Sequence, residues 1–539
     1  MVTRLHVSSH RYESSHRYES ARRDGALTCR RRAGLRTGGR LLAVLLAVLM
    51  GCLGVTACTG PTSTPSDPAT ATLTVGATAQ PPSLDATGQD AAAVAQVMLY
   101  NVYETLVRID GDGHLEPLLA QRWTISPDRK TYTFTLDPKA KFASGRRVVA
   151  QDVVWNINRI KTDAAVTPTN KAHLAVVQDV KGQGDDTVVV KLSKPSNAWL
   201  YAMTSTAGMI YDSKANVDFA SATAGSGPYT LDRWTKGSDL VLKRNNAYWG
   251  NQSRFASVTF RYFADPNAMN AAMLSGGIDV ISNLQAPQAL GQFADPSRFT
   301  VINGTTNGEV VMSLNNTATA LKDKRVRQAI NYAIDREALV KTVWAGQGQL
   351  IGSMVPPTDP WYTDLSDTYP YDPAKAKQLL AAAGYAGGLK LRMRLPTLPY
   401  ATASGQFVQS QLKQVGIDAT IDELEFPARW VDQVLVKGDY DISIVAHVEP
   451  RDLGLFANPK YYFHYDNPKF DQLVAAADAG TEQQQTDDLR QASRLLAEDA
   501  AADWLFLLPN LVITTAQVTG VPRNATTLSF DLTTITKTT

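Results

Sequence analysis

The sequence predicts an α/β fold in which strands and helices alternate along most of the chain. A helix–glycine–strand unit supports this class most directly: residues 406–415 have a helical apolar spacing, Gly416 is typical of the position just past a helix end, and residues 417–421 follow as a strand. No unit of 20–50 residues recurs, which argues against a solenoid or a propeller. The 539 residues are also enough for several domains.

The remaining elements follow from the spacing of the apolar residues. Strands are predicted where polar and apolar residues alternate or a short apolar run occurs, at residues 73–75, 131–136, 187–192 and 504–508. Helices are predicted where apolar residues recur every three or four positions, at residues 91–103, from Asp152 onward, at 324–344 and at 486–497. The helix at 324–344 is expected to bury Val326, Ala329, Ile330, Ala333 and Ile334. A tight hairpin turn is expected at 110–113, where the side chains needed for a calcium loop are missing further along.

The first 57 residues have the composition of a secretory leader. Ten of them are Arg, none is Lys, three are acidic, and a Leu-rich run at 41–49 follows Arg40 directly. The segment Val55-Thr56-Ala57-Cys58 resembles the bacterial lipobox, which implies that Cys58 becomes the lipid-modified first residue of the mature chain. A single membrane-spanning segment is the alternative, although residues 41–57 are close to the lower length limit for one.

Removal of this leader changes the sign of the charge. The full chain has 53 basic and 51 acidic residues, of which 10 and 3 lie in residues 1–57, so the remainder has 43 and 48 and a net charge near −5. This balance gives no reason to expect a nucleic-acid partner. Only Cys58 remains among the cysteines, so no disulfide can form within the mature chain. Residues 58–72 are rich in Thr, Pro, Ser and Ala and are predicted to be a flexible tether.

Several sequence blocks, in a fixed order, resemble a known family. They are residues 101–107 (NVYETLV), 118–123 (LLAQRW), 126–136 (SPDRKTYTFTL), 225–229 (GSGPY), 246–250 (NAYWG), 274–280 (LSGGIDV) and 324–336 (KRVRQAINYAIDR). Together, and behind a lipobox, they resemble the family 5 solute-binding proteins of bacterial ABC importers, which bind peptides, dipeptides or nickel. The resemblance runs from about residue 73 to residue 510.

This resemblance implies a two-lobed, periplasmic-binding-protein-like fold with an extra subdomain and a ligand cleft between the lobes. The expected parts are a leader (1–57), a tether (58–72), a first lobe (73–107, 219–303 and 506–539), an extra subdomain (108–218) and a second lobe (304–505). The implied function is a lipid-anchored, extracytoplasmic binding protein that carries oligopeptides to the membrane subunits of an ABC permease. We expect a monomer that is anchored to the membrane by lipid, uses no cofactor and catalyses no reaction.

Two segments match places where peptide-binding relatives contact their ligand. The first is the turn after the first strand, with Gln80 and Pro81. The second follows the strand at 440–446 and offers His447, Glu449, Arg451 and Asp452. Glu449 or Asp452 would hold a peptide ammonium group, and Arg451 would hold a carboxylate. The alternative is a solvated loop with an Arg–Asp pair, and the Trp that relatives often have here is missing.

Other functions remain open from the sequence. The same fold can bind a nickel complex, haem, an opine or an oligosaccharide, and a surface sensor or adhesin is a further class. A secreted hydrolase is the enzyme alternative, but the Gly-x-Ser-x-Gly, His-Glu-x-x-His and P-loop motifs are absent from the sequence. The four histidines of the mature chain (114, 173, 447 and 464) are far apart in sequence, so no metal site is predicted.

Overall fold

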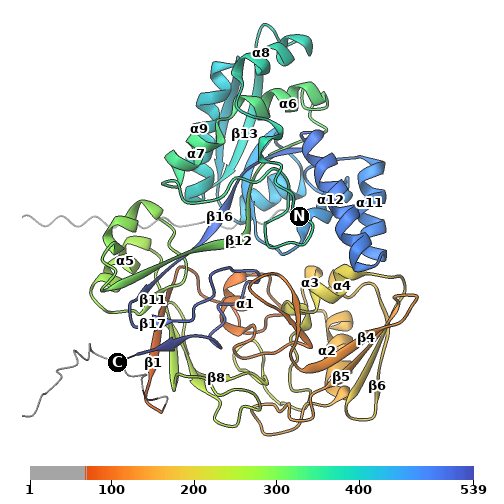
Figure 1. The fold of residues 1–539 in the computed structure, drawn as a ribbon, viewed down its shortest axis with the longest axis vertical. Coiled ribbons are helices and arrows are strands. Elements are labelled where there is room, and N and C mark those ends of the chain that lie inside the picture. The colour runs from red at the N-terminus through yellow and green to blue at the C-terminus, as the bar shows by residue number, and fades with distance from the viewer. Residues whose placement is uncertain (1–66, 68, 539) are drawn as a thin grey trace, which may run out of the picture. The chain divides into compact units, whose positions relative to one another are not determined.

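The computed structural model describes residue 67 and residues 69–538, so the leader, Cys58 and most of the predicted tether lie outside the described residues. Strands and helices are interspersed along the described chain, which confirms the α/β class (Figure 1). The main sheet has ten strands, and their spatial order interleaves distant parts of the sequence. In that order they are β14 (Ile417–Leu424), β13 (Leu389–Pro396), β15 (Ile442–His447), β12 (Phe299–Leu314), β16 (Ala502–Thr515), β11 (Val280–Ile281), β1 (Thr72–Ala77), β10 (Ser257–Tyr262), β9 (Asp239–Arg244) and β8 (Tyr229–Thr235).

Two long strands form the middle of this sheet. β12 has 16 residues and β16 has 14, and they pair antiparallel from Phe299 opposite Thr515 to Ser313 opposite Ala502. The register shifts between Thr305 and Glu309, which interrupts the ladder in the middle of the pair. In Figure 1 the pair runs from the region of β11 to the region of β13. These two strands therefore connect the two ends of the sheet.

A second, four-stranded antiparallel sheet lies in residues 120–192. Its strands, in spatial order, are β4 (Ala120–Ile125), β5 (Thr131–Leu136), β7 (Thr187–Leu192) and β6 (Val177–Gln183). β5 and β7 match their predicted bounds. Alternate side chains of each strand are buried, as expected for a strand with one face on a core. Two short pairs complete the strands: β2 (Val107–Ile109) with β3 (Leu115–Pro117), and β17 (Val518–Thr519) with β18 (Thr536–Lys537). The β2–β3 turn confirms the predicted hairpin.

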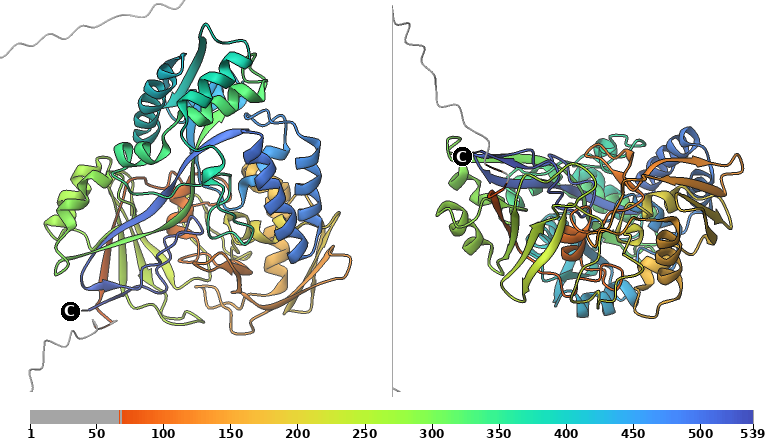
Figure 2. Two further views of the ribbon diagram at one scale, coloured as in Figure 1. Left: turned by 45° about the horizontal axis from the view of Figure 1, so that its top comes forward. Right: turned by 90° about the horizontal axis from the view of Figure 1, so that it is seen from below.

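The helices cover both sheets. The α-helices are α1 (Ala92–Met98), α2 (Ala150–Thr162), α3 (Pro168–His173), α4 (Asn197–Ala202), α5 (Pro266–Leu274), α6 (Lys324–Ala333), α7 (Arg336–Val343), α8 (Pro373–Ala382), α9 (Pro399–Gln414), α10 (Ala428–Trp430), α11 (Pro468–Ala479) and α12 (Glu482–Glu498). Shorter 3₁₀ and π turns are η1 (Thr206–Gly208), η2 (Pro287–Phe293), η3 (Ser366–Thr368), η4 (Val431–Val436) and η5 (Asp452–Ala457). Figures 1 and 2 show α11 and α12 side by side, and α11 packs against α4. Among residues 67 and 69–538, none of the helices combines the length and the hydrophobicity of a membrane span.

The predicted helix at 324–344 is wrong as a single element. The backbone is extended at Ile334 (φ −105°, ψ 116°), and the Asp335 carboxylate then accepts a hydrogen bond from Ala338 N at 2.9 Å, which begins α7. The five side chains predicted to face inward are all buried. Ile334 fits the apolar spacing on both sides of the break, so the spacing alone does not reveal it.

Other helix ends also differ from the prediction, and α12 begins at Glu482, four residues before its predicted start. α1 ends at Met98, because Tyr100 has the left-handed φ of 63°. α2 begins two residues before Asp152, whose carboxylate accepts a hydrogen bond from Val149 N at 3.0 Å within the first turn. α9 begins at Pro399, seven residues before the predicted start, and ends before Gly416, whose φ is +94°.

Candidate functional site

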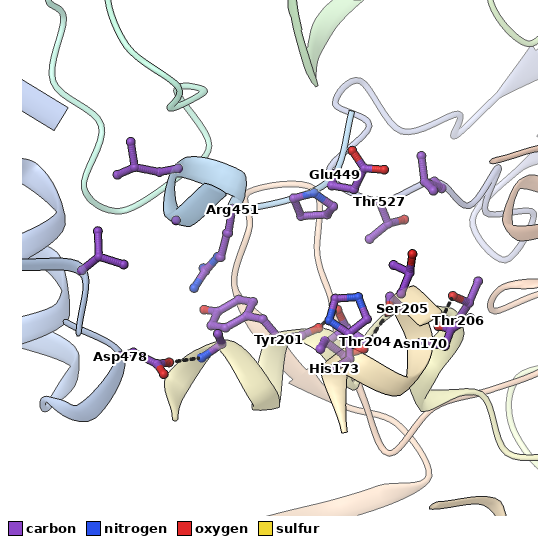
Figure 3. Close-up of a pocket in the computed structure, with 18 of the residues that line it drawn as sticks. Asn170, His173, Tyr201, Thr204, Ser205, Thr206, Glu449, Arg451, Asp478 and Thr527 are labelled. Carbon is purple, nitrogen blue, oxygen red and sulfur yellow. Dashed lines mark hydrogen bonds between the residues drawn. The ribbon is translucent and has the colours of Figure 1, made fainter. Parts of the chain in front are cut away.

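A cavity of about 580 Å³ lies where three distant parts of the chain meet. One wall comes from residues 89–99 and from α3, α4 and η1. The opposite wall comes from residues 449–457 and from α11 and α12, and residues 527–528 close part of the floor. Figure 3 shows Tyr201 and His173 on the first wall, facing Arg451 and Glu449 on the second. The cavity volume is in the range of small-molecule sites.

The first wall is held rigid by polar contacts. The Thr167 side chain caps α3 by accepting a hydrogen bond from Asn170 N, and Asn170 Nδ2 donates to Thr87 O at 3.2 Å. Thr206 of η1 in turn donates to Asn170 Oδ1 at 3.1 Å. His173 ends α3, and partial desolvation by the surrounding protein lowers the pKa of its imidazole.

Arg451 connects the two walls. It has a left-handed backbone (φ 61°), and its guanidinium carbon lies 3.0 Å from the ring centroid of Tyr201 and 4.6 Å from that of Trp361. Its Nη2 donates to Gly113 O in the β2–β3 turn at 3.3 Å, and its Nε lies 3.8 Å from Asp359 Oδ1. Its side chain is 11% exposed, so the charge is largely removed from water while one face borders the cavity.

Acidic groups gather behind the same wall. Glu449 is exposed and lines the cavity, whereas Asp452 and Glu309 are buried. Burial, and then the charges of neighbouring carboxylates, raise the pKa of both buried groups well above the usual range. His447 is buried beside them, and burial lowers its pKa to about 4, so its ring is neutral above that pH.

The structure brings together some predicted site residues and separates others. Glu449 and Arg451 line the cavity, and His447 and Asp452 lie just behind it. Gln80 Oε1 instead accepts a hydrogen bond from Gly237 N at 2.7 Å, Pro81 is buried, and neither lines the cavity. The role of these six residues in ligand binding stays a prediction, and Cys58 lies outside the described residues.

None of the residues of the first wall is among the site residues predicted from the sequence. Its contributors include Asn170, His173, Tyr201 and Thr206, which lie about 250 residues before the second wall in sequence. Short helices such as α3 and α4 have too few turns for an apolar period to be visible. The signal that was present is the cap residue Thr167 followed directly by Pro168, which is typical of a helix start.

The cavity can hold a small solute with charges of both signs. It offers a carboxylate at Glu449, a guanidinium at Arg451, an imidazole at His173 and an aromatic face at Tyr201. Hydroxyl groups of Thr204, Ser205 and Thr206 are nearby (Figure 3). Such a set orients a ligand through a few polar contacts on a largely apolar surface.

Comparison with known proteins identifies the family. A sequence model described as "Bacterial extracellular solute-binding proteins, family 5 Middle" matches residues 114–450. The glutathione-binding protein GsiB of Salmonella paratyphi A (strain ATCC 9150 / SARB42) is 30% identical over 343 residues, which cover 62% of this chain and 65% of GsiB, so the chain matches less than two thirds of that relative. The probable D,D-dipeptide-binding periplasmic protein DdpA of Escherichia coli (strain K12) is 28% identical over 474 residues, covering 80% of this chain and 88% of DdpA.

The solved structures confirm the predicted fold class. The periplasmic binding protein DppA from Helicobacter pylori, in complex with the peptide STSA, superposes with a TM-score of 0.75 at 22% identity and covers 87% of this chain and 98% of DppA. The superposition shows a shared, periplasmic-binding-protein-like fold, and at 22% identity it shows the fold alone. The family model spans more than half of the 539 residues and includes most of the sequence blocks that first indicated the relationship. The protein therefore belongs to the family 5 bacterial extracellular solute-binding proteins.

Proposed function

We propose that the protein is the substrate-binding protein of an ABC importer, that it binds oligopeptides in the cavity, and that it delivers them to the membrane permease. The observation that carries this proposal is the cavity itself, with Glu449 and Arg451 on one wall and Tyr201 on the other. Glu449 would attract the ammonium end of a peptide and Arg451 its carboxylate. Support comes from the relatives, since GsiB is named for glutathione, DdpA for D,D-dipeptides, and DppA was solved with a peptide.

Binding and release would depend on two lobes that open and close. The proposed lobes and subdomain keep their predicted bounds, with 108–218 as the extra subdomain and 304–505 as the second lobe. Separate clusters of buried apolar side chains support this division, one within 106–210 and two within 310–507. The long strands β12 and β16 would act as the hinge, because they connect the two ends of the main sheet.

We also propose that Cys58 carries the lipid that anchors the protein on the extracytoplasmic side of the membrane. The lipobox sequence supports this, and a tether over residues 58–72 would let the lobes move above the membrane surface. Mass spectrometry of the cell-associated protein should show acyl chains on Cys58. A Cys58→Ala variant should be released from the membrane fraction, and its retention there would contradict the anchor.

The solute class is tested by native mass spectrometry followed by titration. Protein purified from its own host should carry short peptides, and calorimetry with glutathione and a tetrapeptide panel should give saturable heats without turnover. The double variant Glu449→Ala/Asp452→Ala should bind the best peptide at least tenfold more weakly while keeping its melting temperature. Glu423→Ala, an exposed carboxylate on β14, is the matched control. Unchanged affinity in the double variant would refute these site residues, and no peptide binding by the wild type would refute the solute class.

A further inference from the structure

Three potential metal ligands lie within six residues of one another behind the second wall. They are His447 at the end of β15, Glu449 and Asp452, and their ligand atoms all lie within 4.8 Å of one another. The left-handed conformation of Arg451 turns the chain sharply, so that Asp452 at the start of η5 points back toward His447. His447 Nδ1 and Asp452 Oδ2 lie 3.7 Å apart.

The Asp452 carboxylate is buried without a partner. Its side chain is 4% exposed, and neither oxygen finds a hydrogen-bond partner among the described residues. The 3.7 Å separation from His447 is longer than a hydrogen bond. Glu309 lies directly opposite His447 in the β12–β15 register, is 1% exposed, and its Oε2 also has no partner within that part of the chain. A buried carboxylate without a hydrogen-bond partner is costly in its ionised form unless a cation compensates the charge.

We propose that His447, Glu449 and Asp452 bind a divalent transition-metal ion. A neutral imidazole nitrogen with two carboxylates is a ligand set that suits Zn²⁺ and similar ions.

Small movements of the three side chains would bring their ligand atoms to the separations found around a bound metal ion. Zinc–ligand bonds of about 2.0–2.2 Å place the ligand atoms roughly 3–4 Å apart, somewhat closer than the 4.8 Å limit seen here. Glu449 is exposed and can rotate to close this difference. The other ring nitrogen of His447, Nε2, lies 2.9 Å from the Tyr462 hydroxyl, which lies 2.7 Å from Ser313 Oγ. When Nε2–H donates to Tyr462, the Nδ1 lone pair is free for the metal.

The test measures zinc uptake by the full chain, purified without a polyhistidine tag and stripped with EDTA. Equilibrium dialysis against zinc chloride, read by elemental mass spectrometry, should show that Glu449→Gln and Asp452→Asn each hold one equivalent less than the wild type at low micromolar zinc. The control is His114→Gln, which alters an exposed His–Asp pair in the β2–β3 turn and should leave the uptake unchanged.

Thermal melting distinguishes a variant that has lost the metal site from one that no longer folds. Asp452→Asn removes a buried carboxylate that has no partner, so its metal-free form should melt at or above the wild-type temperature. Zinc should raise the melting temperature of the wild type but not that of Asp452→Asn. Equal zinc uptake by the wild type and Asp452→Asn, or no uptake by either, would overturn the site. Peptide titration in the presence of EDTA tests the proposed function separately, because either result can fail without the other.

Discussion

At the scale of single residues, Glu104 gives the molecule a pH dependence. Its carboxylate is 1% exposed and accepts hydrogen bonds from the Tyr248 hydroxyl at 2.7 Å and from Trp249 Nε1 at 2.9 Å. Burial outweighs these bonds and raises its pKa to about 7. The folded state therefore holds a proton between pH 4.5 and 7 that the unfolded state releases, and the stability from this group falls as pH rises through that window.

The variant Glu104→Gln should make the free energy of unfolding less dependent on pH in this range. Between pH 5 and pH 8 the wild type should lose roughly 3 kcal/mol of unfolding free energy that the variant does not lose, as expected for a shift from 4.5 to about 7. Urea unfolding at each pH measures the difference. Buried Asp359 and Asp503 change stability in the same direction, but they are present in both proteins and cancel. Parallel profiles for the two proteins would show that Glu104 is ionised throughout.

Glu449 and Arg451 were predicted as site residues because their segment matches one where peptide-binding relatives contact their ligand, and both border the cavity. Glu309 was missed, because its burial depends on the facing strand β15, which is distant in sequence. Gln80 was assigned by resemblance alone, and its actual partner, Gly237, lies 157 positions away. Sequence spacing carries no information about such distant neighbours.

At the scale of elements, the break between α6 and α7 depends on one side chain. Asp335 accepts the hydrogen bond from Ala338 N that satisfies the first turn of α7, and Gln411 Oε1 accepts from Asp335 N at 2.8 Å. Asp335→Ala should therefore lower the unfolding free energy by about 1 kcal/mol, whereas Asp335→Asn should retain most of it. Chemical denaturation of both variants is the measurement. Equal losses for Ala and Asn would indicate that the carboxylate charge, and not its capping role, is what matters.

Element prediction succeeded where one pattern governs the whole segment. β5 alternates strictly between polar and apolar residues and β7 is a short run centred on three valines, and the bounds of both agree with the structure residue for residue. The prediction failed where two patterns overlap: the apolar spacing passes unbroken through Ile334, while the cap signal at Asp335 competes with it. α4 escaped notice because its six residues, which begin after the cap Ser196, are too short to show a period.

At the scale of the whole molecule, the order of strands in the main sheet could not be read from the sequence. β1 lies between β10 and β11, and β12 lies between β15 and β16, so neighbours in the sheet come from segments that are far apart in sequence, as Val280 and Thr514 show. Local patterns fix which residues face a core, but not which distant strand they face. The family resemblance implied two lobes and a subdomain, but no strand order was predicted from it.

A polar latch joins the proposed subdomain to the second lobe at one end of the cavity. The Asp478 carboxylate, labelled in Figure 3, accepts hydrogen bonds from Ser196 Oγ and Ala198 N, both at 2.9 Å, where α4 begins. The Asn197 side chain donates to Ala477 O and Gly480 O, also at 2.9 Å. These contacts exist only while the two parts are together, so they favour the closed form over an open one.

Asp478→Ala should therefore shift the ligand-free protein toward the open form and weaken solute binding. Loss of two hydrogen bonds to a carboxylate destabilises the closed form by about 1–3 kcal/mol, and we expect about a tenfold fall in affinity. Small-angle scattering should show a larger radius of gyration for the free variant, and saturating solute should restore the wild-type value. Asp487→Ala, an exposed carboxylate on the neighbouring helix α12, is the control. Identical scattering and affinity for Asp478→Ala and the wild type would mean that solute contacts alone hold the lobes together.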